Sequence, residues 1–274
     1  MRIDDPADPR LDDYRTLTDP ELRKRFEAER GVFIVESPLA VEALAASRHA
    51  AATRSLLVGE RRLARMAPVI EALAAHDVAV FTAPAEVLRA TAGFDLHRGV
   101  VAAVDRPDPV PVEAFVDGCR RLLVLEGIND HENLGALFRN AAAFGIDGVL
   151  LDPSCADPWY RRSVRVSMGH VLRVPHARAE RWPAILERMA AVQGWDVVTL
   201  TPDAGAVLHD RAPAGPDDRI AVVVGAEGPG LSDVVDGLPG LERRRIAMAS
   251  GVDSLNVATS AAVALSHLLA PHLS

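Results

Sequence analysis

The chain has 274 residues, 49% of them apolar, which is enough to build the cores of two ordinary domains. Its formal net charge of −8 excludes a broad basic face and argues mildly against a nucleic-acid partner. Cys119 and Cys155 fit no metal or redox spacing, and the acidic, polar first residues do not resemble a signal peptide, so we expect a cytoplasmic protein with reduced thiols.

The N-terminal part of the chain predicts a small α/β/α domain at residues 1–107, in which residues 1–30 form a partly extended lead-in. Apolar runs rich in β-branched residues predict strands, and amphipathic runs between them predict helices. The predicted strands are residues 31–36, 55–59, 78–83 and 99–104, and the predicted helices are residues 38–47 and 64–74.

A proline-rich segment separates this domain from the rest of the chain. RPDPVPV, residues 106–112, cannot continue a helix or a central strand, so we place a linker at residues 108–115. The second domain, residues 116–274, has predicted strands at 121–127, 148–152, 196–200, 219–225 and 244–248, and predicted helices at 132–144, 159–168, 181–193 and 255–270. Because these strands are apolar throughout, they predict an α/β fold with a mostly parallel sheet covered on both faces.

The last 21 residues, 254–274, contain no Asp, Glu, Lys or Arg. Polar side chains interrupt this stretch, whereas a membrane span takes about 20 predominantly apolar residues. We therefore expect a helix that is buried nearly all round, in a core or in a subunit interface.

Ligands of open parallel sheets bind at the carboxyl ends of strands, and such ends carry unusual polar residues here. The first is LEGINDHENLGALFRNAAAFGIDG, residues 125–148. Arg139 lies about 100° of helix rotation away from the apolar stripe and can reach out beside the sheet. Alternatively, Asn133 is an N-cap and Arg139 a solvated helix residue, and this stretch alone does not decide between the two.

The second polar end is GAEGPGLS, residues 225–232, which follows a run of β-branched residues. Its G-x-x-G-x-G spacing is wrong for a dinucleotide turn, Pro229 removes a backbone donor, and Glu227 would repel a pyrophosphate. A tight turn that enters a helix at Leu231 would explain the glycines but not the acid. The carboxylate therefore indicates a ligand that is neutral or cationic nearby.

The third polar end is MASGVDSLNVATSAAVALSHLL, residues 248–269. Ser254 is placed as the N-cap of the terminal helix, and Asn256 lies in the first turn, where a buried amide needs a partner. Because all three ends lie at the same edge of one predicted sheet, we interpret them as parts of one site.

Together these stretches resemble a known family. The N-x-G-x-x-x-R sequence that starts at Asn133, G-x-E-G-x-G-L-S at 225–232 and S-L-N-V at 254–257 are similar to the ordered motifs of the SpoU (TrmH-like) branch of the SPOUT RNA methyltransferases. RVSMGHVLRVP, residues 165–175, resembles the family's segment after the second strand. VFIVES and HRGVVAAV resemble the substrate-binding domain that is often fused ahead of the catalytic one, so the resemblance covers nearly the whole chain.

The resemblance implies a C-terminal domain threaded into a trefoil knot, with S-adenosylmethionine (S-adenosyl-L-methionine) bound in the knot. It implies an obligate homodimer through that domain, without a metal or a membrane. The implied reaction transfers a methyl group to a ribose 2′-hydroxyl of structured RNA, with rRNA favoured by the fused front domain and tRNA left open. Because S-adenosylmethionine has no phosphate and carries a sulfonium cation, Glu227 need not clash with it.

Carried over position by position, the resemblance assigns roles to individual residues. The implied catalytic site consists of Asn133, Arg139, Glu227, Ser254 and Asn256. The implied cofactor-binding residues are Gly225, Glu227, Gly228, Gly230, Ile246, Met248 and Leu255. A guanidinium is a poor base because its pKa exceeds about 12, so we expect Arg139 to grip the adjacent phosphate and to stabilise the forming alkoxide.

Several residues depart from the family's pattern. The stretch from Asp130 to Asn133 lacks the proline of the usual D-P-x-N, and Ala247 and Ala258 replace a common proline and serine. Ser37 replaces a glycine in the first domain. These departures concern loop rigidity and details of the pocket rather than the reaction class.

Competing functions remain open at this point. An RNA-binding relative that lost its activity is disfavoured by the intact Asn133, Arg139 and Glu227, and a nicotinamide-dependent oxidoreductase is disfavoured by the glycine spacing. Residues 161–165 carry three arginines that form either a basic rim for RNA or a merely solvated run, and the sequence does not decide which.

Overall fold

The computed structural model describes residues 1–15, 17, 27, 29–93, 99–192, 194–203 and 205–269. These residues fold into two compact units. Unit 1 comprises Met1–Asp108 and Pro158–Arg173, and unit 2 comprises Pro109–Asp157 and Val174–Ser274. Much of the predicted lead-in between residues 16 and 28, and the predicted end of the terminal helix at residue 270, lie outside the described residues.

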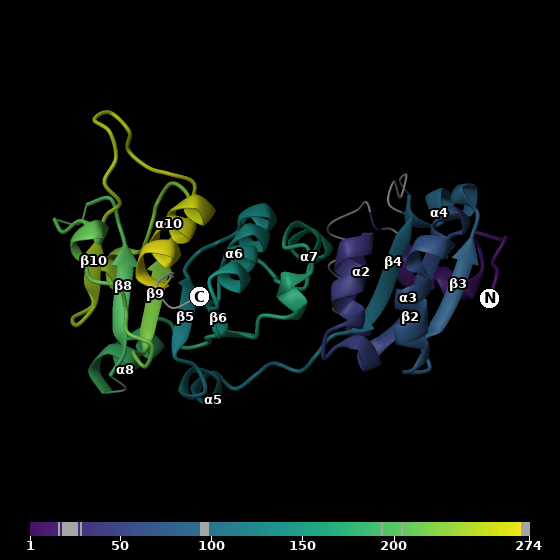
Figure 1. Ribbon diagram of the computed structural model, residues 1–274, viewed down its shortest axis with the longest axis horizontal. Coiled ribbons are helices and arrows are strands. Elements are labelled where there is room, and N and C mark those ends of the chain that lie inside the picture. The colour runs from purple at the N-terminus through teal and green to yellow at the C-terminus, as the bar shows by residue number, and fades with distance from the viewer. Residues whose placement is uncertain are drawn as a thin grey trace. The chain divides into compact units, whose positions relative to one another are not determined.

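The described part of unit 1 contains a four-stranded sheet in the order β1-β4-β2-β3 (Figure 1). Its strands are β1 (Val32–Glu36), β2 (Thr53–Gly59), β3 (Ala79–Ala83) and β4 (Val100–Asp105). β4 pairs antiparallel with β1 and with β2, whereas β2 and β3 are parallel. Every residue of β1 is buried, so both faces of this sheet are covered.

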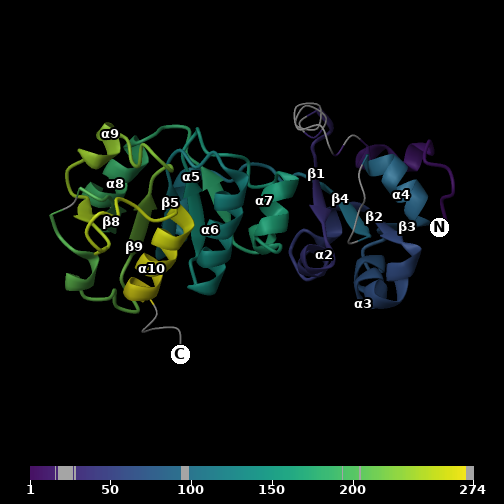
Figure 2. The same cartoon turned by 90° about the horizontal axis from the view of Figure 1, so that it is seen from above.

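Helices cover the two faces of this sheet (Figure 2). One face carries α2 (Pro38–Ala45) and α3 (Leu63–Ala74), and the other carries η1 (Pro9–Tyr14) and α4 (Ala85–Ala92). Two short 3-10 turns are η2 (Ala50–Ala52) and η3 (Glu60–Arg62). α2 begins where the Ser37 hydroxyl accepts a hydrogen bond from the Ala40 backbone N–H. α4 ends at Gly93, whose φ of 81° suits glycine.

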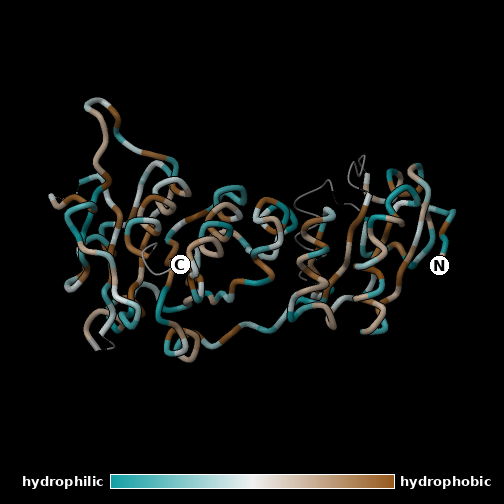
Figure 3. Tube along the Cα trace, in the orientation of Figure 1, coloured by the Kyte–Doolittle hydropathy of each residue, from teal (hydrophilic) through white to brown (hydrophobic). Residues whose placement is uncertain are grey.

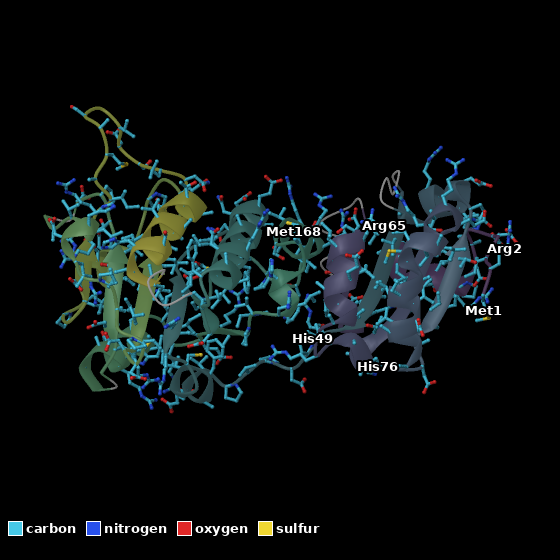
Figure 4. The ribbon with its side chains drawn as sticks, viewed as in Figure 1. Met1, Arg2, His49, Arg65, His76 and Met168 are labelled. Carbon is cyan, nitrogen blue, oxygen red and sulfur yellow. The ribbon has the colours of Figure 1, made fainter. Side chains whose placement is uncertain are left out.

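Unit 1 is completed by a segment that comes from much later in the chain. This segment carries α7 (Arg161–Val166) and η4 (His170–Leu172) and packs on β1, and Met168, labelled in Figure 4, lies in the turn between them. The Trp159 ring lies 4.7 Å from that of Phe33, and Arg161 Nη1 lies 2.6 Å from Oε2 of the buried Glu36. Residues 158–173, which we predicted as part of the second domain, thus pack on β1 and group with unit 1.

The connection between the units is shorter than predicted. α5 (Val112–Asp117) occupies part of the predicted linker 108–115. Pro111 precedes its first turn, where the missing N–H of a proline does not interrupt helical hydrogen bonding. The residues without regular structure between β4 and α5 are 106–111.

In the described part of unit 2, six strands form a parallel sheet in the order β10-β8-β9-β5-β6-β7. The strands are β5 (Arg121–Leu125), β6 (Gly148–Leu151), β7 (His176–Arg178), β8 (Asp196–Leu200), β9 (Ile220–Val224) and β10 (Glu242–Arg244). Figure 3 shows hydrophobic residues concentrated along the strands. The predicted α/β fold with a mostly parallel sheet is confirmed, although the strand predicted at 244–248 lies at 242–244.

Helices also cover both faces of this sheet (Figure 2). α6 (His131–Ala143) and α10 (Val257–Leu269) lie on one face, and α5, α8 (Ala184–Val192) and α9 (Asp233–Asp236) lie on the other, with a 3-10 turn at η5 (Leu208–Asp210). Within the chain, α10 buries Ala261 and Leu265 but exposes Thr259 and Ser266. Within the chain the terminal helix is therefore buried on one side, and the expected burial nearly all round, in a core or in a subunit interface, stays a prediction.

Candidate active site

A cavity of about 440 Å³ lies at the carboxyl edge of the parallel sheet in unit 2. It is lined by residues that follow β8, β9 and β10 and by the start of α10. Its volume falls in the range of small-molecule sites, which is about 300–1,000 Å³. Every residue that the resemblance assigns to cofactor binding lines this cavity, from Gly225 and Glu227 to Met248 and Leu255.

One wall of the cavity is the segment Gly225–Ser232, which we call the glycine loop. A Cβ atom on Gly225 would lie 2.2 Å from the carbonyl carbon of Gly230, because the loop folds back on itself. The turn is closed by the Gly230 backbone N–H, which donates to the Ala226 carbonyl at 3.0 Å. Gly228 has a φ of 90°, which L side chains rarely adopt. The glycines are therefore required by this backbone path.

A single amide joins the three predicted motifs. The Asn256 Nδ2 group donates to Asn133 Oδ1 at 2.9 Å and to Glu227 Oε1 at 2.6 Å. Its Oδ1 accepts hydrogen bonds from the backbone N–H groups of Ala258 and Thr259. Asn256 thus fixes the start of α10 and, at the same time, orients the carboxylate of Glu227 beside the cavity.

The helix caps differ from those considered in the sequence. Asn256, and not Ser254, caps α10. Its backbone carbonyl accepts a hydrogen bond from the Ser260 N–H, and its side-chain Oδ1 accepts one from the Ala258 N–H. Asp130, and not Asn133, caps α6, and its Oδ1 accepts from the backbone N–H of Asn133 at 2.8 Å. Both predicted caps were displaced by a nearby residue of equal capping ability, which leaves the Asn133 side chain available to Asn256.

Arg139 and Ser254 lie apart from this amide. Arg139 is exposed on α6, and Ser254 is exposed in the segment before α10, where it lines the cavity. In the described part of the chain, no hydrogen bond links either side chain to Asn256. The neighbour of Arg139 is used structurally, since Asn140 Nδ2 donates to the Ala258 carbonyl at 2.7 Å and joins α6 to α10.

The sequence did not identify the cavity residues that follow β8. Leu200, Thr201 and Pro202 form part of the wall. Thr201 N–H donates to the Arg244 carbonyl at 3.0 Å, which extends the pairing of β8 with β10 to the rim. Strand ends at this edge were expected to bind ligand, but only the observed strand order places β8 beside β9.

The loop that leads into α6, and so to Asn133, rests on a buried support. Cys155 Sγ accepts the Ile128 N–H at 3.3 Å, and the Ile128 carbonyl accepts the Ala156 N–H at 2.8 Å. The Arg178 guanidinium donates to the carbonyls of Asp152, Cys155 and Ala156. Burial raises the pKa of the Cys155 thiol well above its ordinary value, so this sulfur stays protonated and acts as a structural group.

The described residues contain no group of three or more His, Cys, Asp or Glu side chains that could hold a metal ion. Over the same ranges, no helix is both long enough and apolar enough to span a membrane.

Comparison with known proteins decides the family. Residues 120–266 match the SpoU rRNA methylase family. The chain is also 44% identical over 261 residues to the uncharacterized tRNA/rRNA methyltransferase Rv0881 of Mycobacterium tuberculosis, which covers 95% of this chain and 88% of that protein. The chain belongs to the SpoU family. The resemblance stated from the motifs is therefore confirmed.

Solved structures show the same SpoU architecture over the whole chain. An rRNA methyltransferase from Sinorhizobium meliloti, crystallised with bound AdoMet, has a TM-score of 0.80 at 23% identity and covers 100% of this chain and 99% of its own. At that identity the likeness concerns the fold alone. An RNA 2′-O ribose methyltransferase has a TM-score of 0.74 at 25% identity, with 100% of both chains covered.

Proposed function

We propose that this SpoU protein uses S-adenosylmethionine to methylate a ribose 2′-hydroxyl of structured RNA, with rRNA as its substrate. The observation that carries the proposal is the Asn256 amide, which joins Asn133 and Glu227 at the edge of a glycine-lined cavity. The name of the matched family supports rRNA, and the name of the 25% identical structure supports the ribose 2′-oxygen.

The cavity fits S-adenosylmethionine on physical grounds. The glycine loop leaves backbone rather than side chains facing the ligand, which suits close packing of an adenosine. Glu227 is exposed at the cavity and would disfavour a phosphate but not a sulfonium cation. When bound, S-adenosylmethionine supplies a methyl carbon that its sulfonium makes electrophilic.

The residues of the chain have distinct roles in this proposal. Asn256 and Asn133 hold Glu227 in one orientation, so the acceptor ribose and the methyl donor meet in a fixed geometry. Arg139, which is exposed and makes no described ion pair, grips the phosphate next to the ribose and stabilises the 2′-oxygen as its proton leaves. Ser254 completes the polar rim.

The proposal includes the knot, the homodimer and a cytoplasmic location. The cavity is made by the ends of β8, β9 and β10 together with the start of α10, and this is the region that the family threads into a knot. The exposed side of α10 carries Thr259 and Ser266 and no charge, which suits a symmetric interface between two copies. Light scattering of the purified protein tests the dimer.

Replacement of one arginine tests the proposed reaction. For Arg139→Ala we expect kcat/KM for RNA to fall about a thousandfold, as for other transition-state donors, with cofactor affinity unchanged. Arg188→Ala is the matched control, because Arg188 is also an exposed arginine but lies on α8, across the sheet. Full activity of Arg139→Ala in a radiolabelled-methyl assay would refute the role of Arg139.

The identity of the RNA requires a separate measurement. We expect 2′-O-methyl mapping of total RNA, with and without the gene, to show one lost position in rRNA. A lost position in tRNA would transfer the proposal to that substrate, which the names of the relatives also include. A complete, unchanged set of modifications, together with RNA binding by the protein, would favour an RNA-binding relative without activity.

A further inference from the structure

Glu126, which follows β5, is a buried carboxylate that the proposed reaction does not use. Only 7% of the residue is exposed. Its Oε1 accepts hydrogen bonds from Trp182 Nε1 at 2.8 Å and from Ser232 Oγ at 2.8 Å, and its Oε2 accepts one from Ser232 N at 2.9 Å. Burial of a carboxylate is costly unless donors of this kind surround it, so the surroundings of Glu126 are specific for its charge.

The Glu126 carboxylate holds the end of the glycine loop, and the Glu126 backbone bonds to the residue that precedes the loop. At the start of the loop, the Glu126 backbone N–H donates to the Val224 carbonyl at 3.0 Å, which extends the pairing of β5 with β9. At the end of the loop, the Glu126 carboxylate holds Ser232, which also caps α9. Near its start, the loop also lies close to Gly127, where an added Cβ would be 3.2 Å from Ala226 Cβ.

We propose that Glu126 is a positioning residue whose carboxylate sets the shape of the cofactor cavity by holding the end of the glycine loop at Ser232. Glu126 does not line the cavity, whereas Gly225, Glu227 and Gly230 do, so its effect reaches the ligand through the loop. The inference rests on the proposed binding of S-adenosylmethionine and adds a residue to that site.

Glu126→Gln tests this role with little change in volume. A glutamine presents one acceptor and one amino group, so in either orientation an N–H of Trp182 or Ser232 faces another donor. We expect the Kd for S-adenosylmethionine, measured by calorimetry, to rise about tenfold, as loss of a charged hydrogen bond predicts. The kcat at saturating cofactor and the KM for RNA should stay within about twofold, because Glu126 contacts neither substrate.

Asp147→Asn is the matched control for a purely structural role. Asp147 accepts hydrogen bonds from the backbone N–H groups of Arg120 and Arg121, both at 2.9 Å, at the opposite end of β5. We expect both variants to lower the melting temperature, but only Glu126→Gln to raise the Kd for the cofactor. An unchanged Kd in folded Glu126→Gln would overturn the proposal.

Ser232 variants keep the proposal testable if Glu126→Gln does not fold. We expect Ser232→Ala to raise the Kd about threefold, since it loses one neutral donor, and Ser232→Thr to keep the wild-type Kd. The double variant with Glu126→Gln should bind no more weakly than Glu126→Gln alone, because both changes break one contact. Equal Kd values for Ser232→Ala and wild type would overturn the proposed role of Glu126 but not the proposed cofactor. Absence of S-adenosylmethionine binding by the wild type would overturn the proposed cofactor itself.

Discussion

The two units share a layered α/β/α construction but differ in the direction of their strands. In unit 1, β4 runs antiparallel to its neighbours β1 and β2, so the segment after β4 leaves at the opposite edge from the segments after β1, β2 and β3. In unit 2 the described strands are parallel, and the segments after β8, β9 and β10 reach the same edge, where the cavity lies. The comparison shows that uniform strand direction concentrates polar chemistry from distant parts of the sequence.

The units also differ in charge. Unit 1 contains 19 Arg and Lys residues against 18 Asp and Glu residues, whereas unit 2 contains 11 against 20. The unit with the cavity is therefore strongly acidic, which suits a cationic ligand but not a general affinity for phosphates. If unit 2 binds RNA, it must do so through individually placed groups such as Arg139.

The largest contrast should come from removing a helix cap in each unit. Asn256→Ala removes the cap of α10 and the link between Asn133 and Glu227, and we expect methylation to fall about a thousandfold and stability by about 1 kcal/mol. Ser37→Ala removes the cap of α2 and should cost similar stability with methylation retained. Both expectations are checked by the methylation rate per folded molecule, with the folded fraction taken from urea denaturation. Equal rates for the two variants would contradict a special role of Asn256.

Two glycines within unit 2 should differ nearly as much. Gly225→Ala places a Cβ 2.2 Å from backbone, so the glycine loop must open, and we expect cofactor affinity to fall about a hundredfold. Gly118→Ala meets its nearest neighbour at 3.4 Å, which is ordinary contact, and should bind the cofactor as wild type does. Calorimetry measures both affinities. Retained affinity in Gly225→Ala would mean that the loop adopts another path when the ligand binds.

Two ion pairs test the construction of the units themselves. Arg161→Ala removes the nearer partner of the buried Glu36 carboxylate and leaves Arg165, whose Nη1 lies 4.0 Å from Oε1, so we expect the free energy of unfolding to fall by about 3 kcal/mol. Arg120→Ala breaks an exposed pair with Asp217 and should cost less than about 1 kcal/mol. Urea denaturation followed by tryptophan fluorescence compares them, and equal losses would contradict the importance of the contact between α7 and β1.

The smallest effect concerns pH and has opposite signs in the two units. Burial, and then the charge of Arg48, lower the pKa of His49 below 6.5. As the pH falls, the histidine of the unfolded chain therefore takes up its proton first, and unit 1 loses stability as the pH falls below 6.5. Burial raises the pKa of Cys119 from 9.0 to about 11, so the unfolded thiol ionises first and unit 2 loses stability as pH rises through that window.

Chemical denaturation at acidic, neutral and alkaline pH checks these signs. His49→Gln should remove most of the acid dependence of unit 1, and Cys119→Ala should reduce the alkaline dependence of unit 2. The fluorescence of Trp159, which lies 5.2 Å from the His49 ring, reports on unit 1. A loss of stability at low pH that persists in His49→Gln would assign the effect to another group.

The sequence predicted the sheet of unit 2 and the cavity because local signals carry both. Apolar runs specify buried parallel strands. The glycine loop can be recognised in the sequence because its backbone path tolerates few side chains. The meeting of Asn133, Glu227 and Asn256 was predicted from the motifs together and not from one alone. The caps were wrong because Asp130 and Asn256 compete with neighbours of similar capping strength.

Other features depend on contacts that no local pattern contains. The placement of α7 in unit 1 depends on Trp159 and Arg161, whose partners lie on β1 more than a hundred residues earlier. The three arginines at 161–165 looked alike in sequence, but Arg161 is half of a buried ion pair and cannot contribute freely to a basic rim. The residues after β8 became part of the cavity only through the strand order.

The late segment of unit 1 has a consequence for synthesis of the protein. Domains usually fold as they leave the ribosome, the N-terminal one first. Here the contacts of Phe33 with Trp159 and of Glu36 with Arg161 cannot form until the segment around α7 has been translated, and by then β5 and β6 have already emerged. Translation of residues 1–108 alone would therefore yield a first unit without these contacts, and the nascent chain completes that unit only after it has begun the second.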